Sequence, residues 1–274
     1  LVFVVIGVSY SQSLTSSDKW SLVDLHNEYR AKIANGQING FRSASKMPAL
    51  TWNDKLAQAA QSWADKCEWG HNPSSTSFGE NLHTESGLIT SPGQSVGQAS
   101  ISEVINSGLL GWFNEYGDAY QYPDGRIVES RGGDIGHFTQ MIWEETTQIG
   151  CGYTKCNNYP PGHYLVCNYY PAGNFNMDIA PVYNIGSTGN QCSNGKRSDG
   201  LCNGSGGSGT ELTPQTPSPT TSSSSGGGSG STGADAQQSY IQNICNNCYS
   251  SSTQCYPCIT TVTCCNGQSK EFTD

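Results

Sequence analysis

His137 is a side chain that could carry chemistry, because an imidazole can transfer a proton or bind a metal ion near neutral pH. It lies in the stretch 136–143, where Phe138, Met141 and Ile142 recur at helical spacing and form an apolar face. A lone histidine beside such a face is usually a hydrogen-bonded core residue. Residues 136–143 alone do not distinguish a functional histidine from a core histidine, so the rest of the sequence has to be considered.

Two short patterns imitate well-known sites. Residues 93–97 fit G-x-S-x-G around Ser95, but the Ser-Pro pair before them is a poor end for the strand that a nucleophile elbow requires. Residues 204–209 fit G-x-G-x-x-G, with no expected strand before them and no helix after them. The sequence contains no H-E-x-x-H. We therefore expect no catalytic serine, no dinucleotide site and no simple metalloprotease.

Three longer stretches carry a family resemblance. Residues 136–143, Gly-His-Phe-Thr-Gln-Met-Ile-Trp, and residues 164–175 resemble the two signatures of the CAP superfamily, and Gly-Glu-Asn-Leu at 79–82 matches a third element. This superfamily comprises cysteine-rich secretory proteins, antigen 5 venom allergens and plant pathogenesis-related proteins. The resemblance covers residues 17–183, approximately. It implies an α+β fold, a three-layer α-β-α sandwich of CAP type.

The resemblance also gathers four polar residues that no spacing rule would group. His71, Glu80, Glu115 and His137 match the positions of the family's central-cleft tetrad. Two imidazoles and two carboxylates suit a borderline divalent cation such as Zn²⁺. We expect His71 and His137 to bind it reversibly, with Glu80 and Glu115 orienting the imidazoles or holding a bound water, and folding not to require the metal. The alternative is a buried hydrogen-bonded cluster that only specifies the fold.

Cysteine content indicates an oxidising compartment, since the chain has twelve cysteines in 274 residues. Cys67, Cys151, Cys156 and Cys167 allow three connectivities, and sequence spacing does not choose among them. The family resemblance implies the pairs Cys67–Cys156 and Cys151–Cys167.

Charge and the N-terminal stretch bear on location and partners. The net charge is −9 and the pI about 4.9, so the chain offers no basic surface for nucleic acid or an anionic membrane. Residues 1–8 are apolar but too short to span a bilayer, and Ser9 and Ser11 supply the small residues that precede a signal-peptidase cut. We expect residues 1–12 to be a signal-peptide remnant and the protein to be secreted, with no transmembrane segment.

Hydrophobic spacing predicts the elements that must position the tetrad. The helices are expected at 17–35, 54–67, 98–116 and 136–143, and two pairing strands at 149–154 and 163–170. Asn53 is the expected N-cap of the second helix, and His26 is expected to pack in the apolar stripe of the first. Gly108 and Gly111 weaken the third helix by about 1 kcal/mol each relative to alanine. Residues 117–133 are expected to be loop.

Composition divides the chain after the CAP-like region. The expected segments are a CAP domain at 17–186, a small extension at 187–203 closed by Cys192–Cys202, a Gly/Ser/Thr/Pro linker at 204–233 and a small cysteine-rich tail at 239–274. Asn203 begins the only usable N-glycosylation sequon, so we expect a surface glycan there. The six tail cysteines include two C-x-x-C pairs, which could bind zinc but in a secreted chain favour three disulfides.

Three functions follow as hypotheses. The first, which the resemblance favours, is a secreted non-enzymatic effector, defence or venom-allergen-like protein that binds a lipid or sterol or an extracellular protein receptor. The aromatic loop of sterol-binding relatives has its nearest counterpart in 116–131, with Tyr120 and Tyr122, although the spacing departs from the usual motif. The second is a metal-dependent hydrolase with Glu80 or Glu115 as general base. The third is an adhesion or channel-binding module carried by the cysteine-rich tail.

Overall fold

A four-stranded sheet lies at the centre of the residues that the computed structural model describes, which are 13–75, 77–85, 99–156 and 162–204 together with one short strand pair near the C-terminus. The strand order is β1 (Thr51–Trp52), β5 (Gln148–Cys156), β6 (Gly162–Tyr170), β2 (Gly79–Glu85). Strand β6 runs antiparallel to both of its neighbours, whereas β1 pairs parallel with β5. The predicted pairing of 149–154 with 163–170 is confirmed.

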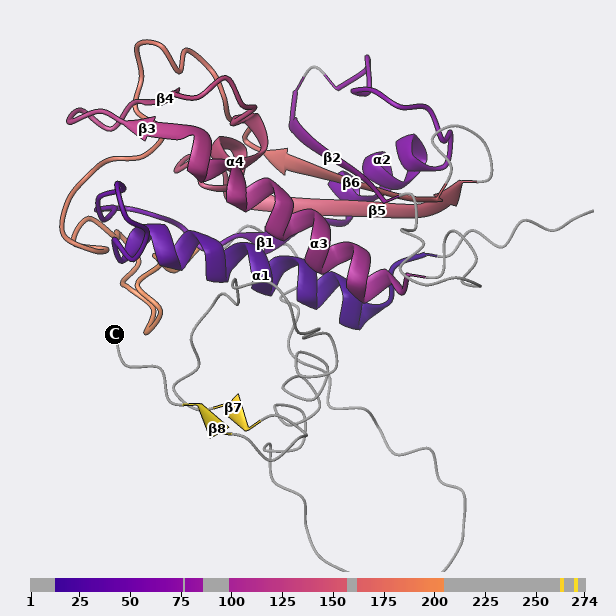
Figure 1. The fold of residues 1–274 in the computed structure, drawn as a ribbon, viewed down its shortest axis with the longest axis horizontal. Helices are drawn as coiled ribbons and strands as arrows, with labels where there is room; N and C mark the ends of the chain where they lie inside the picture. Colours follow the sequence, from indigo (N-terminus) through magenta and orange to yellow (C-terminus); the bar gives the residue numbers. More distant parts are fainter. Residues whose placement is uncertain are drawn as a thin grey trace, which may run out of the picture. The chain divides into compact units, whose positions relative to one another are not determined.

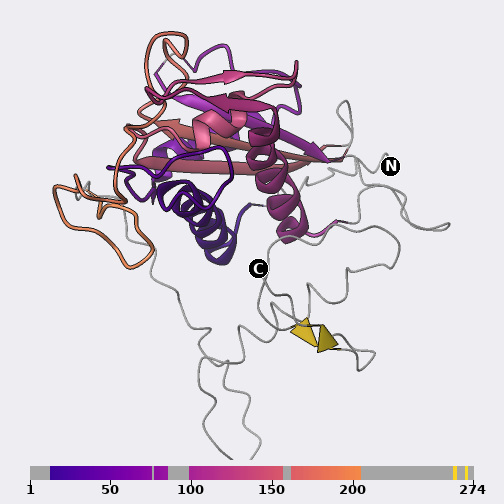
Figure 2. The ribbon, with the colours of Figure 1, turned by 60° about the vertical axis from the view of Figure 1, so that its left-hand side comes forward.

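Helices cover both faces of this sheet (Figure 1). Helix α2 (Asp54–Ala64) packs on one face, against β5 and β6. Helices α1 (Ser16–Ala34), α3 (Ile101–Asn114) and the short α4 (Gly136–Met141) pack together on the other, as Figure 2 also shows. The predicted α+β fold of three layers, α-β-α, is therefore confirmed.

Local capping signals fix where the helices begin. Thr15 caps α1 and exchanges hydrogen bonds with Asp18, so the helix starts one residue before the predicted position. Asn53 caps α2 as predicted, its side chain accepting from two backbone N–H groups of the first turn. Ser100 and Glu103 form the same reciprocal box on α3, which starts three residues after the predicted boundary.

Two glycines let α2 lie directly on β5. A Cβ atom at Gly150 would stand 2.3 Å from the Ala57 backbone nitrogen, and one at Gly152 would stand 2.2 Å from that of Gln61. Such separations are far inside van der Waals contact, so any larger residue would force the helix off the sheet. This close packing sets the height of α2 and of the segment that follows it.

The prediction that residues 117–133 are loop is wrong. They contain the end of a 3₁₀ turn (Glu115–Asp118) and an antiparallel hairpin of β3 (Ala119–Gln121) and β4 (Ile127–Glu129). The hairpin strands are three residues long, too short for the alternating pattern to stand out from the Gly/Asp/Pro-rich sequence around them. Strands β1 and β2 were also not predicted.

Three disulfides join the segment after α2 to β5, β5 to β6, and the two ends of the extension. The structure joins Cys67 to Cys156, Cys151 to Cys167 and Cys192 to Cys202. The first two are the pairs that the family resemblance implies. The extension is not separate from the domain core, since Leu201 is fully buried in it.

Several predictions concern residues outside the described ranges. These are the signal-peptide remnant at 1–12, the Ser95 pattern, the linker beyond residue 204 and the tail cysteines. Within the second unit, Ser218–Asp274, the described elements are β7 (Val262–Thr263) and β8 (Ser269–Lys270), which pair antiparallel. Among the described residues, no helix is both long and apolar enough to cross a membrane.

The Arg30 side chain lies fully buried between α1 and the turn after α4. Its guanidinium donates five hydrogen bonds of 2.8–3.2 Å to the carbonyl oxygens of Pro48, Met141, Trp143 and Thr146. All five N–H groups are thereby used, and four carbonyls from two distant loops gain a donor. Glu144, itself buried, lies close enough to offset part of the positive charge.

Replacing Arg30 should destabilise the domain strongly. In Arg30→Met the four carbonyls lose their donor and Glu144 loses its counter-charge, so we expect the free energy of unfolding to fall by about 3–5 kcal/mol. Urea denaturation measures the change. The matched control is Arg42→Met, because Arg42 is exposed and donates one side-chain bond to a carbonyl, that of Tyr122; it should cost less than about 1 kcal/mol. Equal losses in the two variants would contradict this account.

Candidate functional site

The four predicted tetrad residues lie where β2, the end of α3 and the start of α4 come together. Glu80 stands on β2, Glu115 directly follows α3, His137 is the second residue of α4, and His71 belongs to the segment between α2 and β2. The structure arranges them as two imidazole–carboxylate pairs, His137 with Glu115 and His71 with Glu80.

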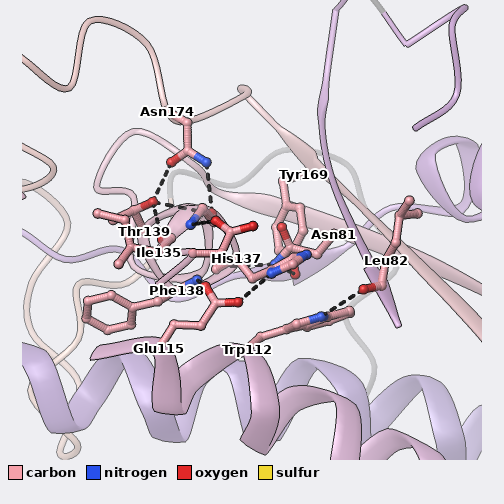
Figure 3. Close-up of polar contacts among 12 residues, drawn as sticks. Asn81, Leu82, Trp112, Glu115, Ile135, His137, Phe138, Thr139, Tyr169 and Asn174 are labelled. Atoms are coloured by element: carbon pink, nitrogen blue, oxygen red, sulfur yellow. Dashed lines mark hydrogen bonds and ion pairs between the residues drawn. The ribbon is translucent and has the colours of Figure 1, made fainter. Parts of the chain in front are cut away.

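Figure 3 shows the His137–Glu115 pair, whose side chains are 25% and 17% exposed. His137 Nδ1 lies 2.5 Å from Glu115 Oε1, and the backbone N–H of Phe138 donates to Glu115 Oε2 at 3.0 Å. The carboxylate therefore caps the first turn of α4 while it holds the imidazole. In the neutral ring this contact places the proton on Nδ1 and leaves the Nε2 lone pair for another partner.

Trp112 and Asn81 fix the position of His137 from two further directions. The Trp112 indole stacks on the imidazole with centroids 5.9 Å apart and planes 15° apart, and its N–H donates to the Leu82 carbonyl. The Asn81 amide donates to the His137 carbonyl and to the Tyr169 hydroxyl, both at 3.2 Å. The strand β2 thus holds the histidine through its own side chains and backbone (Figure 3).

The His71–Glu80 pair is asymmetric in its exposure. His71 Nδ1 lies 3.0 Å from Glu80 Oε1, and the backbone N–H of Asn72 donates to the same oxygen at 2.9 Å. The Glu80 side chain is only 3% exposed, whereas that of His71 is 68% exposed. Glu80 Oε2 is buried and has no hydrogen-bond partner among the described residues. A buried carboxylate therefore holds one nitrogen of an imidazole that faces solvent.

The two pairs do not form a closed metal cage. In the described ranges, no group of three or more His, Cys, Asp or Glu side chains is placed to hold a metal ion together. What the pairs offer is two imidazoles, each with a carboxylate at Nδ1 and with Nε2 available. The imidazole and carboxylate donors of these pairs are of the chemical type that binds a borderline divalent ion such as Zn²⁺.

The predicted glycosylation site and the two loop tyrosines lie at the surface. Asn203 is exposed and its amide donates to the Asn194 carbonyl at 2.9 Å, so the sequon asparagine stands at the surface. Tyr120 and Tyr122 lie on the β3–β4 hairpin in an edge-to-face pair with centroids 5.2 Å apart, and both are exposed.

Sequence analysis missed a second polar cluster made by His83, Glu85 and Ser107. The first two project from β2 and the third from α3. Burial lowers the pKa of His83 below its ordinary value, and the neighbouring Glu85 opposes that shift. Recognising β2 as a strand would have placed the two residues on one face, because side chains two apart on a strand share a face.

His26 is a core residue, as predicted. It is fully buried, with Nδ1 2.7 Å from the Leu22 carbonyl and Nε2 2.9 Å from the Tyr169 hydroxyl. Burial lowers the pKa of His26 to about 4, and the positive charge of Arg30 acts in the same direction. His26 is therefore neutral in the folded protein near pH 7, and through Tyr169 it supports the Asn81 amide that holds His137.

Comparison with known proteins gives one consistent result. The family described as "CAP: Cysteine-rich secretory protein family" matches residues 23–169. Scoloptoxin SSD976 of Scolopendra dehaani is 32% identical over 210 residues, covering 74% of this chain and 94% of its own. Venom allergen 5 of Vespa velutina is 37% identical over 187 residues, covering 65% of this chain and 85% of its own.

A solved structure shares the fold. The crystal structure of NaASP2 with Zn2+ superimposes with a TM-score of 0.58 at 24% sequence identity, covering 70% of this chain and 97% of that one.

The buried His26 should make stability depend on pH. The unfolded state takes up a proton near pH 6.5 and the folded state only near pH 4, so stability contributed by neutral His26 is complete above pH 6.5 and is lost as pH falls toward 4. We expect a loss of about 2–3 kcal/mol between pH 7 and 4.5 that is absent in His26→Gln. Urea denaturation at both pH values measures it. His71→Gln, at an exposed position, should keep the wild-type pH dependence; the same dependence in all three proteins would refute the assignment.

Proposed function

The chain belongs to the cysteine-rich secretory protein (CAP) family, and on that premise we propose that it is a secreted, non-enzymatic, venom-allergen-like protein whose tetrad binds a divalent cation such as Zn²⁺ reversibly. His71 and His137 would be the ligands, through Nε2. Glu80 and Glu115 would hold the imidazoles in place.

One observation carries this proposal, namely that each imidazole has a carboxylate at Nδ1. Metal-binding histidines usually donate their other N–H to a carboxylate or carbonyl, which fixes the tautomer and makes the ligating nitrogen more basic. The same fold in NaASP2, whose crystal structure was obtained with Zn2+, supports a zinc site on this scaffold.

The cation would add to a structure that is already formed. The sheet, the buried Arg30 and the Cys67–Cys156 and Cys151–Cys167 bridges hold the domain together without it. Zinc would therefore modulate the surface around His71 rather than drive folding, unlike the ion of a zinc finger.

The carboxylates favour a binding role over a hydrolytic one. Both oxygens of Glu115 are engaged, one by His137 and one by the Phe138 N–H, and Glu80 Oε1 accepts two bonds. Glu80 Oε2 has no hydrogen-bond partner among the described residues, but it is buried away from solvent. A general base for a metal-bound water needs a free carboxylate oxygen aimed at that water. We therefore propose a lipid or extracellular protein as partner, and the exposed Tyr120 and Tyr122 support an apolar component of that contact.

Zinc calorimetry tests the proposed function. At pH 7.5 we expect a saturable binding heat from one ion bound by both histidines. At pH 5.5 the affinity should be at least about tenfold lower, because a protonated imidazole cannot ligate. His71→Ala and His137→Ala should each remove this ion, and Glu115→Gln should weaken it by about 10–100-fold. Glu145→Gln, which removes an exposed carboxylate, serves as the control.

Two results would refute the proposal. One is the absence of zinc binding at pH 7.5, and the other is a stoichiometry and affinity that neither histidine substitution changes. The tetrad would then be a hydrogen-bonded cluster that stabilises the junction of β2, α3 and α4.

A further inference from the structure

The cluster of His83, Glu85 and Ser107 brings three different ligand atoms to one point beside the tetrad. Ser107 Oγ lies 2.5 Å from Glu85 Oε2 and 3.4 Å from His83 Nε2, and His83 Nε2 lies 3.6 Å from Glu85 Oε2. The proposed function uses none of these side chains. They come from two elements that contact each other, β2 and α3, so the cluster is set by tertiary packing.

The spacing of these atoms matches the spacing of ligands around a tetrahedral ion. Ligands at about 2.0–2.1 Å from zinc in tetrahedral geometry stand about 3.3–3.4 Å apart. The two distances to His83 Nε2, 3.4 and 3.6 Å, are already close to this value. The Ser107–Glu85 separation would lengthen by about 0.8 Å on the same geometry, with the neutral hydroxyl keeping its proton, turning it away from Glu85 and binding the ion through an oxygen lone pair.

From this geometry we propose that His83 Nε2, Glu85 Oε2 and Ser107 Oγ form a second divalent-cation site, distinct from the tetrad, whose remaining ligands are water. One imidazole, one carboxylate and one hydroxyl select a borderline ion such as Zn²⁺ over Ca²⁺ or Mg²⁺, which prefer sets of oxygen ligands. The His83 and Glu85 side chains are 22% and 23% exposed, so an ion can reach them.

The His83 ring is held in this position by the packing of α3. A Cβ atom at Gly108 would stand 3.0 Å from the ring atoms Cγ and Cδ2, a tight contact that would require the imidazole to move by a few tenths of an ångström. Trp112 borders the ring edge-to-face, with centroids 6.5 Å apart. Gly108 and Trp112 therefore keep the ring, and with it Nε2, beside Glu85 and Ser107.

Calorimetry with zinc chloride alone separates the two sites. Wild-type protein should bind two ions, and the His71→Ala/His137→Ala double variant should still bind one. Adding His83→Gln to that double variant should remove the remaining ion, and Glu85→Gln should weaken it by at least about tenfold, since loss of a direct ligand costs no less than loss of its supporting partner. Ser107→Ala, at an exposed position, should weaken it without affecting folding.

A glycine pair in α3 provides a matched control. Gly108→Ala should push the His83 ring away and lower affinity at the second site, whereas Gly111→Ala, where a Cβ would meet nothing within 4 Å, should leave it unchanged. Both substitutions add the same methyl group to the same helix. NMR signals of the His83 ring protons in the double variant should shift on zinc addition.

The outcomes distinguish this proposal from the proposed function. A double variant that binds no zinc, or a remaining ion that His83→Gln and Glu85→Gln leave unchanged, would overturn the second site and leave the tetrad proposal standing. Loss of the second ion alone in His83→Gln, with tetrad binding retained, is the supporting result. A wild-type protein that binds one ion, lost in His83→Gln and kept in the double variant, would support the second site and refute the tetrad.

Discussion

The buried guanidinium of Arg30 is the interaction on which the arrangement of the site depends. It joins α1 to the Pro48 loop and to the turn that follows α4. Helix α4 has only six residues, too few to be stable alone, so its position has to come from its contacts. Arg30 binds the carbonyls at its C-terminal end, and Glu115 binds the Phe138 N–H at its N-terminal end. His137 is placed between these two anchors, one from α1 and one from the end of α3.

Strand β2 connects this anchored helix to the rest of the polar side chains. Its residues alternate between two roles, with Glu80 holding His71 and Asn81 holding the backbone of His137. The next residues on the Asn81 face are His83 and Glu85. The strand lies at the edge of the sheet and contacts both α3 and α4. A single edge strand therefore supplies residues to both candidate cation sites. Trp112 lies against a histidine of each site, His83 and His137.

Local signals allowed much of the fold to be predicted. The Asn53 cap, the apolar stripes of the helices and the pairing of β5 with β6 can be recognised from short stretches of sequence. Strand β2 could not be recognised, because only Asn81 and Leu82 among its seven residues are buried and no alternating apolar pattern results. Of the candidate site, the four tetrad residues came from family resemblance. Their grouping into two pairs, and the cluster around His83, depend on which segments β2 contacts.

Gly108 shows why propensity alone could not reveal the second cluster. On helix propensity, Gly108 and Gly111 carry the same cost of about 1 kcal/mol relative to alanine. In the structure their surroundings differ, because a methyl group at Gly108 would stand 3.0 Å from the His83 ring, whereas one at Gly111 would meet nothing within 4 Å. A helix that keeps a destabilising residue at the one position where a neighbouring imidazole needs room gives up local stability for a tertiary contact. The sequence contains both glycines, but only the packing of β2 on α3 assigns a role to one of them.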